Sequence, residues 1–159
     1  MQYYDGAAWA NLGSMTEVTA FTASGTFTPP AGVTYAIAHI RGGGGGAGKL
    51  SSGVGGTSSV AFAGGTISAT GGGVINHDVS TGAQTYAGAT NSGNGAFYNA
   101  SDGAGNSTQG GQAGNGAYIV AGGAVTPAVG ITVTVGAGGT AGTSGSAGGS
   151  GYVWIEYLV

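Results

Sequence analysis

Glycine recurs at every third position near the C-terminal end of the chain, and this repeat limits the fold more than any other feature. Three residues per turn is the repeat of the polyproline II helix, which has no internal hydrogen bonds. Glycines spaced in this way line one edge of such a helix, so a neighbouring segment can approach closely. The backbone N–H and C=O groups must then find partners in other segments, which predicts a bundle of polyproline II helices. The repeat consists of Gly136, Gly139, Gly142, Gly145, Gly148 and Gly151.

Glycine is also dense throughout the middle of the chain. Of its 39 glycines, all except Gly6, Gly13, Gly25 and Gly32 lie between positions 42 and 151. The stretches between these glycines are shorter than most globular helices, and each internal glycine weakens a helix by up to about 1 kcal/mol. We therefore expect no α-helix in this window. A collagen helix would need far more than the three prolines present, and a flexible linker would not usually be bracketed by apolar strands.

Short strands are predicted around the glycine-rich window. Residues 34–40, 131–135 and 152–159 combine alternation with β-branched and aromatic side chains, and we expect these three to pair into one sheet. Residues 57–62 and 118–121 are shorter candidates, and residues 18–27 are expected to form one entry strand. The predicted fold class is all-β: short antiparallel strands framing a bundle of glycine-rich polyproline II helices, with essentially no α-helix.

Charge and composition exclude several classes of function. Only 4% of the 159 residues are charged, and the two basic side chains cannot neutralise a track of phosphates, so we expect no nucleic-acid partner. Without cysteine and with two histidines, the chain has little material for a metal site, and no metal or cofactor is expected. No window approaches about 18 uninterrupted apolar residues, so we expect no membrane insertion.

Two motifs suggest chemistry that their surroundings do not support. Residues 43–49 have the Gly-x-x-x-x-Gly-Lys spacing of a phosphate loop, but Leu50 stands where Ser or Thr is required and no helix pattern follows. His77 and Asp78 are adjacent, and neighbours in an extended chain point apart. His39 is expected to be a half-buried strand residue with a backbone partner. We therefore predict no catalytic residues and no enzyme. A glycan-cleaving alternative would need two carboxylates, and the central region offers Asp78 and Asp102.

Amide and aromatic side chains interleave between positions 86 and 118. Amides and carboxylates match the hydroxyls of sugars, while aromatic faces cover the apolar side of a pyranose ring. Phe97 and Tyr98 cannot both face one core from an extended strand, so exposure is expected there. Alternatively, these amides cap turns and the aromatic rings seal the ends of the bundle. The candidate receptor-binding residues are Tyr86, Asn91, Asn94, Phe97, Tyr98, Asn99, Asp102 and Asn106.

Taken in order, the segments at 21–34, 41–48, 55–59, 69–73, 131–139 and 148–157 resemble the glycine-rich domain at the distal ends of tailed-bacteriophage tail fibres. The resemblance rests on Phe-Thr-Ala-Ser-Gly-Thr-Phe-Thr-Pro-Pro-Ala-Gly-Val-Thr at 21–34, Arg-Gly-Gly-Gly-Gly-Gly-Ala-Gly at 41–48, Ile-Thr-Val-Thr-Val-Gly-Ala-Gly-Gly at 131–139 and Gly-Gly-Ser-Gly-Tyr-Val-Trp-Ile-Glu-Tyr at 148–157. Gly-Gly-Thr-Ser-Ser at 55–59 and Ala-Thr-Gly-Gly-Gly at 69–73 belong to the same series. It covers residues 18–159, and residues 1–17 look like a connector to a fibre stem.

That resemblance implies a receptor-binding tip, or adhesin, in the virion, made in the host cytoplasm. The implied partner is a host cell-surface glycan or an outer-membrane protein. It also implies a homotrimer attached to a tail fibre or another virion protein. Two alternatives remain open. An ice-binding protein built from polyglycine helices would show a regular face of Thr and Ala, whereas a purely structural virion protein would bury its polar loops against partner subunits.

Overall fold

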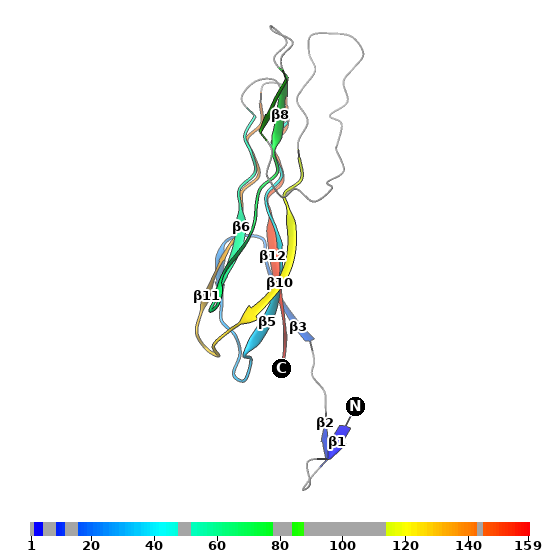
Figure 1. Ribbon diagram of the computed structural model, residues 1–159, viewed down its shortest axis with the longest axis vertical. Coiled ribbons are helices and arrows are strands. Elements are labelled where there is room, and N and C mark those ends of the chain that lie inside the picture. Colours follow the sequence, from blue (N-terminus) through cyan, green and yellow to red (C-terminus); the bar gives the residue numbers. More distant parts are fainter. Residues whose placement is uncertain are drawn as a thin grey trace.

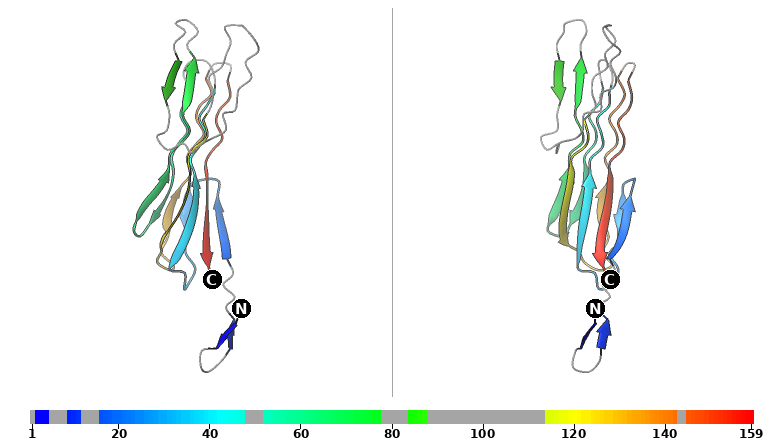
Figure 2. Two further views of the ribbon diagram at one scale, coloured as in Figure 1. Left: turned by 45° about the vertical axis from the view of Figure 1, so that its right-hand side comes forward. Right: turned by 90° about the vertical axis from the view of Figure 1, so that its right-hand side faces the viewer.

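The computed structural model describes residues 2–4, 9–11, 16–47, 52–77, 84–87, 114–142 and 145–159. Within these ranges every regular element is a β-strand, and the strands pair antiparallel throughout. The predicted all-β class is therefore confirmed. The molecule is elongated: long extended segments run away from one side of a sandwich of two sheets, and a short N-terminal hairpin lies beyond its other side (Figures 1 and 2).

Two four-stranded sheets make up the sandwich. The first sheet has the order β10 (Tyr118–Ala124), β5 (Tyr35–Arg41), β12 (Tyr152–Leu158) and β3 (Thr16–Phe21). The second has the order β4 (Gly25–Phe27), β11 (Ile131–Thr134), β6 (Ser58–Phe62) and β7 (Gly65–Ala69). Their inner faces meet in one hydrophobic core that includes Ile40, Ile155, Val60 and Val133. Alternation of buried and exposed residues along each strand places these side chains inside.

Two of the expected pairings are wrong in detail. Residues 131–134 lie in the second sheet, between β4 and β6, whereas β5 and β12 pair with each other in the first. Residues 18–27 are not one strand, because the chain passes from β3 in the first sheet to β4 in the second. A strand with one apolar face fits either sheet of a sandwich, so alternation alone does not choose its partner.

Residues 42–47, the central segment, continue from the end of β5 as the middle of the predicted bundle. Their backbone N–H groups point to three neighbouring segments in strict rotation. Such a rotation with a period of three residues is the geometry of a polyproline II helix. The hydrogen bonds run from Gly42 to Ala117 O (3.0 Å), Gly43 to Gly56 O (2.9 Å), Gly44 to Gly149 O (2.8 Å), Gly45 to Gly114 O (2.8 Å), Gly46 to Gly53 O (2.8 Å) and Ala47 to Ser146 O (2.8 Å).

The central segment also accepts hydrogen bonds from two further segments. Gly72 N–H donates to Gly43 O at 2.7 Å, and Gly139 N–H donates to Gly44 O at 2.8 Å. Five segments therefore surround it. Four of them are joined directly to a strand of the sandwich, and the fifth, 136–142, follows β11 after one residue, Val135. The bundle consists of the central segment with residues 52–57, 70–73, 114–117, 136–142 and 145–151.

The repeated glycines near the C-terminal end supply the N–H groups that bond inside the bundle, as the repeat predicts. Gly136 N–H donates to the Ser58 hydroxyl at 2.9 Å. The other five all donate to backbone carbonyl groups: Gly139 to Gly44 (2.8 Å), Gly142 to Ala47 (3.1 Å), Gly145 to Gly142 (3.1 Å), Gly148 to Gly139 (2.9 Å) and Gly151 to Gly136 (2.8 Å).

Close packing explains why most bundle positions are glycine. A Cβ atom added at Gly43 would lie well inside contact distance of Ala137 O, and one at Gly46 would clash in the same way with Thr140 O. Gly44 is the exception in this run, because its nearest neighbour would be Gly149 N at 3.6 Å, an ordinary contact. The bundle therefore forbids side chains at defined positions rather than everywhere.

Two short hairpins complete the described structure. β1 (Gln2–Tyr4) pairs with β2 (Trp9–Asn11), and β8 (Val74–His77) pairs with β9 (Gln84–Ala87). The β8–β9 hairpin follows the bundle, and the C-terminus lies at the opposite, sandwich end of the molecule (Figure 1).

Candidate binding surface

The outer face of the first sheet carries large apolar and aromatic side chains, and we call it the aromatic face. Tyr35 and Leu158 each expose 58% of their surface and Val18 exposes 57%. Contiguous exposed apolar surface of this kind marks a binding site more often than chance, because a lone monomer gains nothing from it. The aromatic face comprises Val18 of β3, Tyr35, Ile37, His39 and Arg41 of β5, Tyr118 and Val120 of β10, and Tyr152, Trp154, Glu156 and Leu158 of β12.

Stacked rings form the part of this face nearest the bundle. Trp154 stacks with Tyr152, with ring centroids 5.2 Å apart and an interplanar angle of 8°, and with His39 at 4.6 Å and 16°. Tyr118 tilts against both Trp154 and His39, at 6.2 Å from each. The pairings Trp154 with His39 and Tyr152 with Arg41 follow from the register of β12 and β5. Cross-strand ring pairs of this kind stabilise a sheet and hold the rings in place.

His39 links three strands through its side chain. Its Nδ1 lies 2.7 Å from the Tyr118 hydroxyl of β10, and its Nε2 lies 3.4 Å from Glu156 Oε1 of β12. A proton on Nε2 faces the carboxylate and leaves Nδ1 to accept the hydrogen bond from Tyr118. The expectation of a half-buried His39 is correct, with 18% of its side chain exposed, but the expected backbone partner is wrong, since both partners are side chains.

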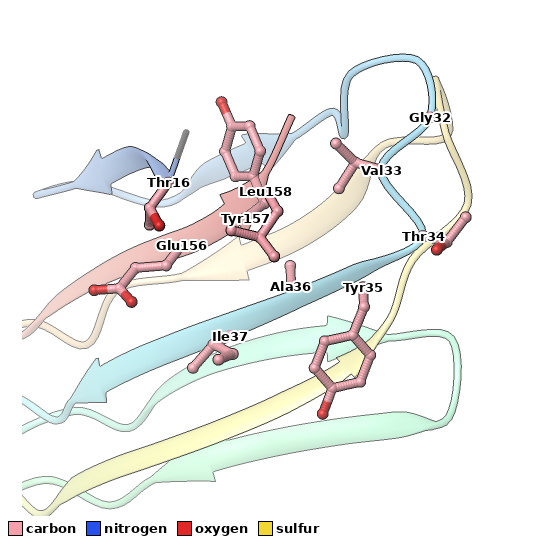
Figure 3. A pocket seen from close by; sticks show the side chains of 10 residues that line it. All are labelled: Thr16, Gly32, Val33, Thr34, Tyr35, Ala36, Ile37, Glu156, Tyr157 and Leu158. Atoms are coloured by element: carbon pink, nitrogen blue, oxygen red, sulfur yellow. The ribbon is translucent and has the colours of Figure 1, made fainter. Parts of the chain in front are cut away.

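An open pocket of about 400 Å³ lies at the other end of the aromatic face, between the start of β5 and the end of β12. Figure 3 shows Tyr35 and Ile37 reaching out from β5 beside Leu158 and Glu156 of β12, with Thr16 of β3 at the rim. The lining is mostly apolar, and the Glu156 carboxylate supplies its single acidic group. The pocket thus extends the aromatic face toward the end of the molecule at which β3 begins.

Two adjacent glycines in β10 make room for large rings on both sides of the first sheet. A Cβ at Gly122 would strike the ring of Tyr35 on the aromatic face. A Cβ at Gly123 would strike the ring of Phe62, a core residue of the second sheet. The pair therefore lets an edge strand pass between an outer and an inner aromatic side chain.

The receptor-binding residues predicted from sequence lie elsewhere in the chain. Tyr86 belongs to β9, where it pairs with Ile75 of β8. His77 is the last residue of β8, and its neighbour Asp78 lies outside the described residues. The remaining candidates also lie outside them: Asn91, Asn94, Phe97, Tyr98, Asn99, Asp102 and Asn106.

Sequence reasoning missed the aromatic face, although the last strand carries a signal for it. In residues 152–158 the inward set is Val153, Ile155 and Tyr157, while the alternate set contains Tyr152 and Trp154. Both faces of this strand are therefore apolar. A strand of that composition is typical of a sheet covered on both sides, whereas a sheet with one solvated face alternates between apolar and polar residues.

Two kinds of feature are missing from the described residues: a cluster of metal-ligating side chains and a helix that could span a membrane. No group of three or more His, Asp or Glu side chains among them is placed to hold a metal ion. The same residues contain no helix of the length and apolar character needed to span a bilayer. His39 with Glu156 is the contact between a basic and an acidic side chain found in this part of the chain, and it is an ion pair only when the imidazole is protonated; Arg41 makes no such contact there.

Comparison of the chain with protein-family models, with curated proteins and with solved structures finds no match.

Proposed function

We propose that this chain is the receptor-binding tip of a bacteriophage tail fibre, an adhesin that binds a host cell-surface glycan or an outer-membrane protein. The observation that carries the proposal is the hydrogen-bonded bundle around residues 42–47, which makes a stiff platform from sequence that would otherwise be flexible. Binding residues work best on loops that a rigid scaffold positions. Residues 18–159 form the binding domain, and residues 1–17 connect it to a stem or a partner protein.

The positions of the chain segments support a domain that is attached at one end and contacts the receptor at the other. Ala47, the β8–β9 hairpin and Gly114, at which described segments end, all lie on the bundle side of the sandwich. The C-terminus lies at the sandwich end (Figure 1). One end of the domain therefore suits attachment and the other suits contact with a receptor. Three copies on one fibre would raise the avidity of weak individual contacts.

Cell binding tests this proposal. Fluorescently labelled chain should bind a susceptible bacterium, and enzymatic removal of surface glycans or deletion of the receptor porin should abolish binding. Replacing Phe97, Tyr98 and Asn99 together by Ala should lower binding at least about tenfold, as expected for loss of aromatic anchors. Thr132→Ala, on an exposed position of the second sheet, is the matched control. Equal binding by the triple variant would refute the choice of site.

Binding without cleavage is part of the proposal. Incubation with capsular polysaccharide should release no new reducing ends. If reducing ends appear and vanish on Asp78→Asn or Asp102→Asn, the chain is a depolymerase and not a pure adhesin.

An ice-binding function is the second candidate, because the outer face of the second sheet carries rows of hydroxyl groups. Thr132 lies opposite Thr26, and Ser59 lies between Thr134 and Ser68. Each row is short, and the twist of a sandwich sheet turns successive strands by about 20° or more, which opposes a match to a flat lattice. Thermal hysteresis that disappears on Thr132→Lys would favour this function over the adhesin.

A further inference from the structure

The two outer faces of the sandwich differ in chemistry although both lie at the surface. The second sheet presents Thr26, Thr132, Thr134 and Ser68, all exposed hydroxyl side chains. The first presents Val18, Tyr35, Ile37, Val120 and Leu158, each at least 39% exposed. In a chain with so few charges, hydroxyl groups are what keep a surface hydrated. We call this outer surface of the second sheet the hydroxyl face. Its side chains can hydrogen-bond to water, whereas most side chains of the aromatic face cannot.

We propose that the aromatic face is the interface between copies of this chain, which lie parallel around a common axis with these faces turned inward. The number of copies, three, rests on the homotrimer of the proposed function, whereas the choice of face rests on the structure. A ring of this kind is formed by heterologous contacts. The half of the face on β12 and β3 of one copy meets the half on β10 and β5 of the next.

The size and composition of the aromatic face fit an interface. Four strands about 4.8 Å apart and seven residues of about 3.3 Å each span roughly 19 by 23 Å. Side chains raise the accessible area above this projection, and each copy divides this area between its two neighbours, so each single contact lies at the small end of specific interfaces. Tyr and Trp are enriched in such interfaces, and charge is depleted at their centres. Here the stack of Tyr152, Trp154 and His39 lies among aliphatic side chains, and Arg41 lies at the last position of β5.

The few charged side chains of the aromatic face are divided between its two halves, with the basic ones on β5 and the acidic one on β12. Arg41 and His39 belong to β5, and Glu156 belongs to β12. His39 is already paired with Glu156 inside one copy, so burial of that pair leaves neither group without a partner. A neighbouring copy brings its Glu156-bearing half against the half that carries Arg41, so the two halves differ in the sign of their charge, although Glu156 lies level with Ile37 and not with Arg41. A second copy is thus complementary to the face without any further protein.

The mass of the purified full chain in solution tests the proposal. Sedimentation equilibrium between about 1 and about 100 µM, a range that covers weak interfaces, should give the mass of three chains at the upper end. Val18→Glu on β3 and Val120→Lys on β10 should each give monomers, because each buries an unpaired charge at the contact. Both positions are about half exposed in one copy, so Val120→Lys should leave the unfolding temperature of the monomer unchanged. Val18→Glu should lower it slightly, because the new carboxylate lies opposite Glu156 in the register of β3 and β12.

Combining Val18→Glu with Val120→Lys in one chain should restore the trimer, because the two charges then meet across each contact between copies. Thr132→Glu, on the hydroxyl face, should leave the mass of three chains unchanged. A monomeric wild-type chain at every concentration, or equal loss of assembly by Thr132→Glu, would overturn the proposal. Failure of the double variant to reassociate would overturn the contact between unlike halves.

Fluorescence provides a second readout that does not depend on mass. The chain has two tryptophans, so in a Trp9→Phe background the emission comes from Trp154 alone. Dilution to monomers should shift this emission to the red and increase its quenching by iodide. Cell binding is measured separately, so a monomer that still binds cells would refute the interface and leave the adhesin in place.

Discussion

Ser58 is a buried polar residue at the junction of the sandwich and the bundle. Its hydroxyl donates to Arg41 O at 2.6 Å and accepts from Gly136 N–H at 2.9 Å. It is fully buried, so a lost partner cannot be replaced by bulk water. Ser58 therefore joins the end of β5 to the first residue of the glycine repeat.

Ser58→Ala should lower the free energy of unfolding by about 1 to 3 kcal/mol, because it leaves the buried Gly136 N–H without an acceptor. Ser59→Ala, one residue along on the outer face, should change it by less than about 0.5 kcal/mol. Urea unfolding followed by tryptophan fluorescence measures both. Equal effects would show that the buried hydroxyl has no special role.

Neighbouring glycines in one run should respond differently to the same substitution. Gly43→Ala and Gly46→Ala should each cost about 2 to 3 kcal/mol, since the new methyl group meets a backbone oxygen that cannot move alone. Gly44→Ala should cost less than about 1 kcal/mol, because its methyl group makes only ordinary contacts and the unfolded chain loses freedom. Three urea titrations compare them. A uniform loss would mean that backbone entropy, and not packing, sets the need for glycine.

At the scale of elements, the repeat at 136–151 allowed the bundle to be predicted, because glycine at every third position matches the three residues per turn of a polyproline II helix. The strand at 152–158 was also predictable, since aromatic and β-branched residues dominate it. The partner of 131–134 was not, because its Ile and Val pattern fits both sheets equally well. The aromatic face was not predicted, because Trp154 and its neighbours lie on strands, where apolar side chains are also expected in a core, whereas interleaved amides and rings are typical of a binding loop.

Hydrogen exchange should show the period of three directly. The amides of Gly139, Gly148 and Gly151 donate to backbone carbonyl groups, whereas within the described residues no backbone acceptor pairs with the amides of Ala137 and Gly149, which are exposed residues. Exchange measured by NMR should therefore be slow at the first three and fast at the other two, since protection follows buried hydrogen bonds. Uniformly fast exchange over 136–151 would contradict the bundle and remove the main support for the adhesin.

At the scale of the whole molecule, the sandwich and the bundle are parts of the same continuous segments. β5 runs into the central segment, and β12 and β10 each begin where a bundle segment ends. Neither part can lose its packing without displacing the chain that forms the other. The two parts should therefore behave as one cooperative unit.

Thermal unfolding should accordingly be a single transition. In the Trp9→Phe background, the emission of Trp154, in the sandwich, and circular dichroism, which reports on the whole backbone, should give the same midpoint within about 1 °C for a two-state domain. Gly46→Ala, which lies in the bundle, should lower both midpoints together. Separate transitions, or a shift in only one signal, would show that the bundle melts independently.

The central position of residues 42–47 has a consequence for biosynthesis. Their last partners, residues 145–149, are more than 90 positions further along the chain, as the hydrogen bonds of Gly44 to Gly149 and Ala47 to Ser146 require. A ribosome adds about 5 to 20 residues per second, so the early glycines wait several seconds for neighbours that do not yet exist. Assembly must therefore follow translation of this region, and a chain cut short before residue 145 is expected to be degraded by cellular proteases instead of folding.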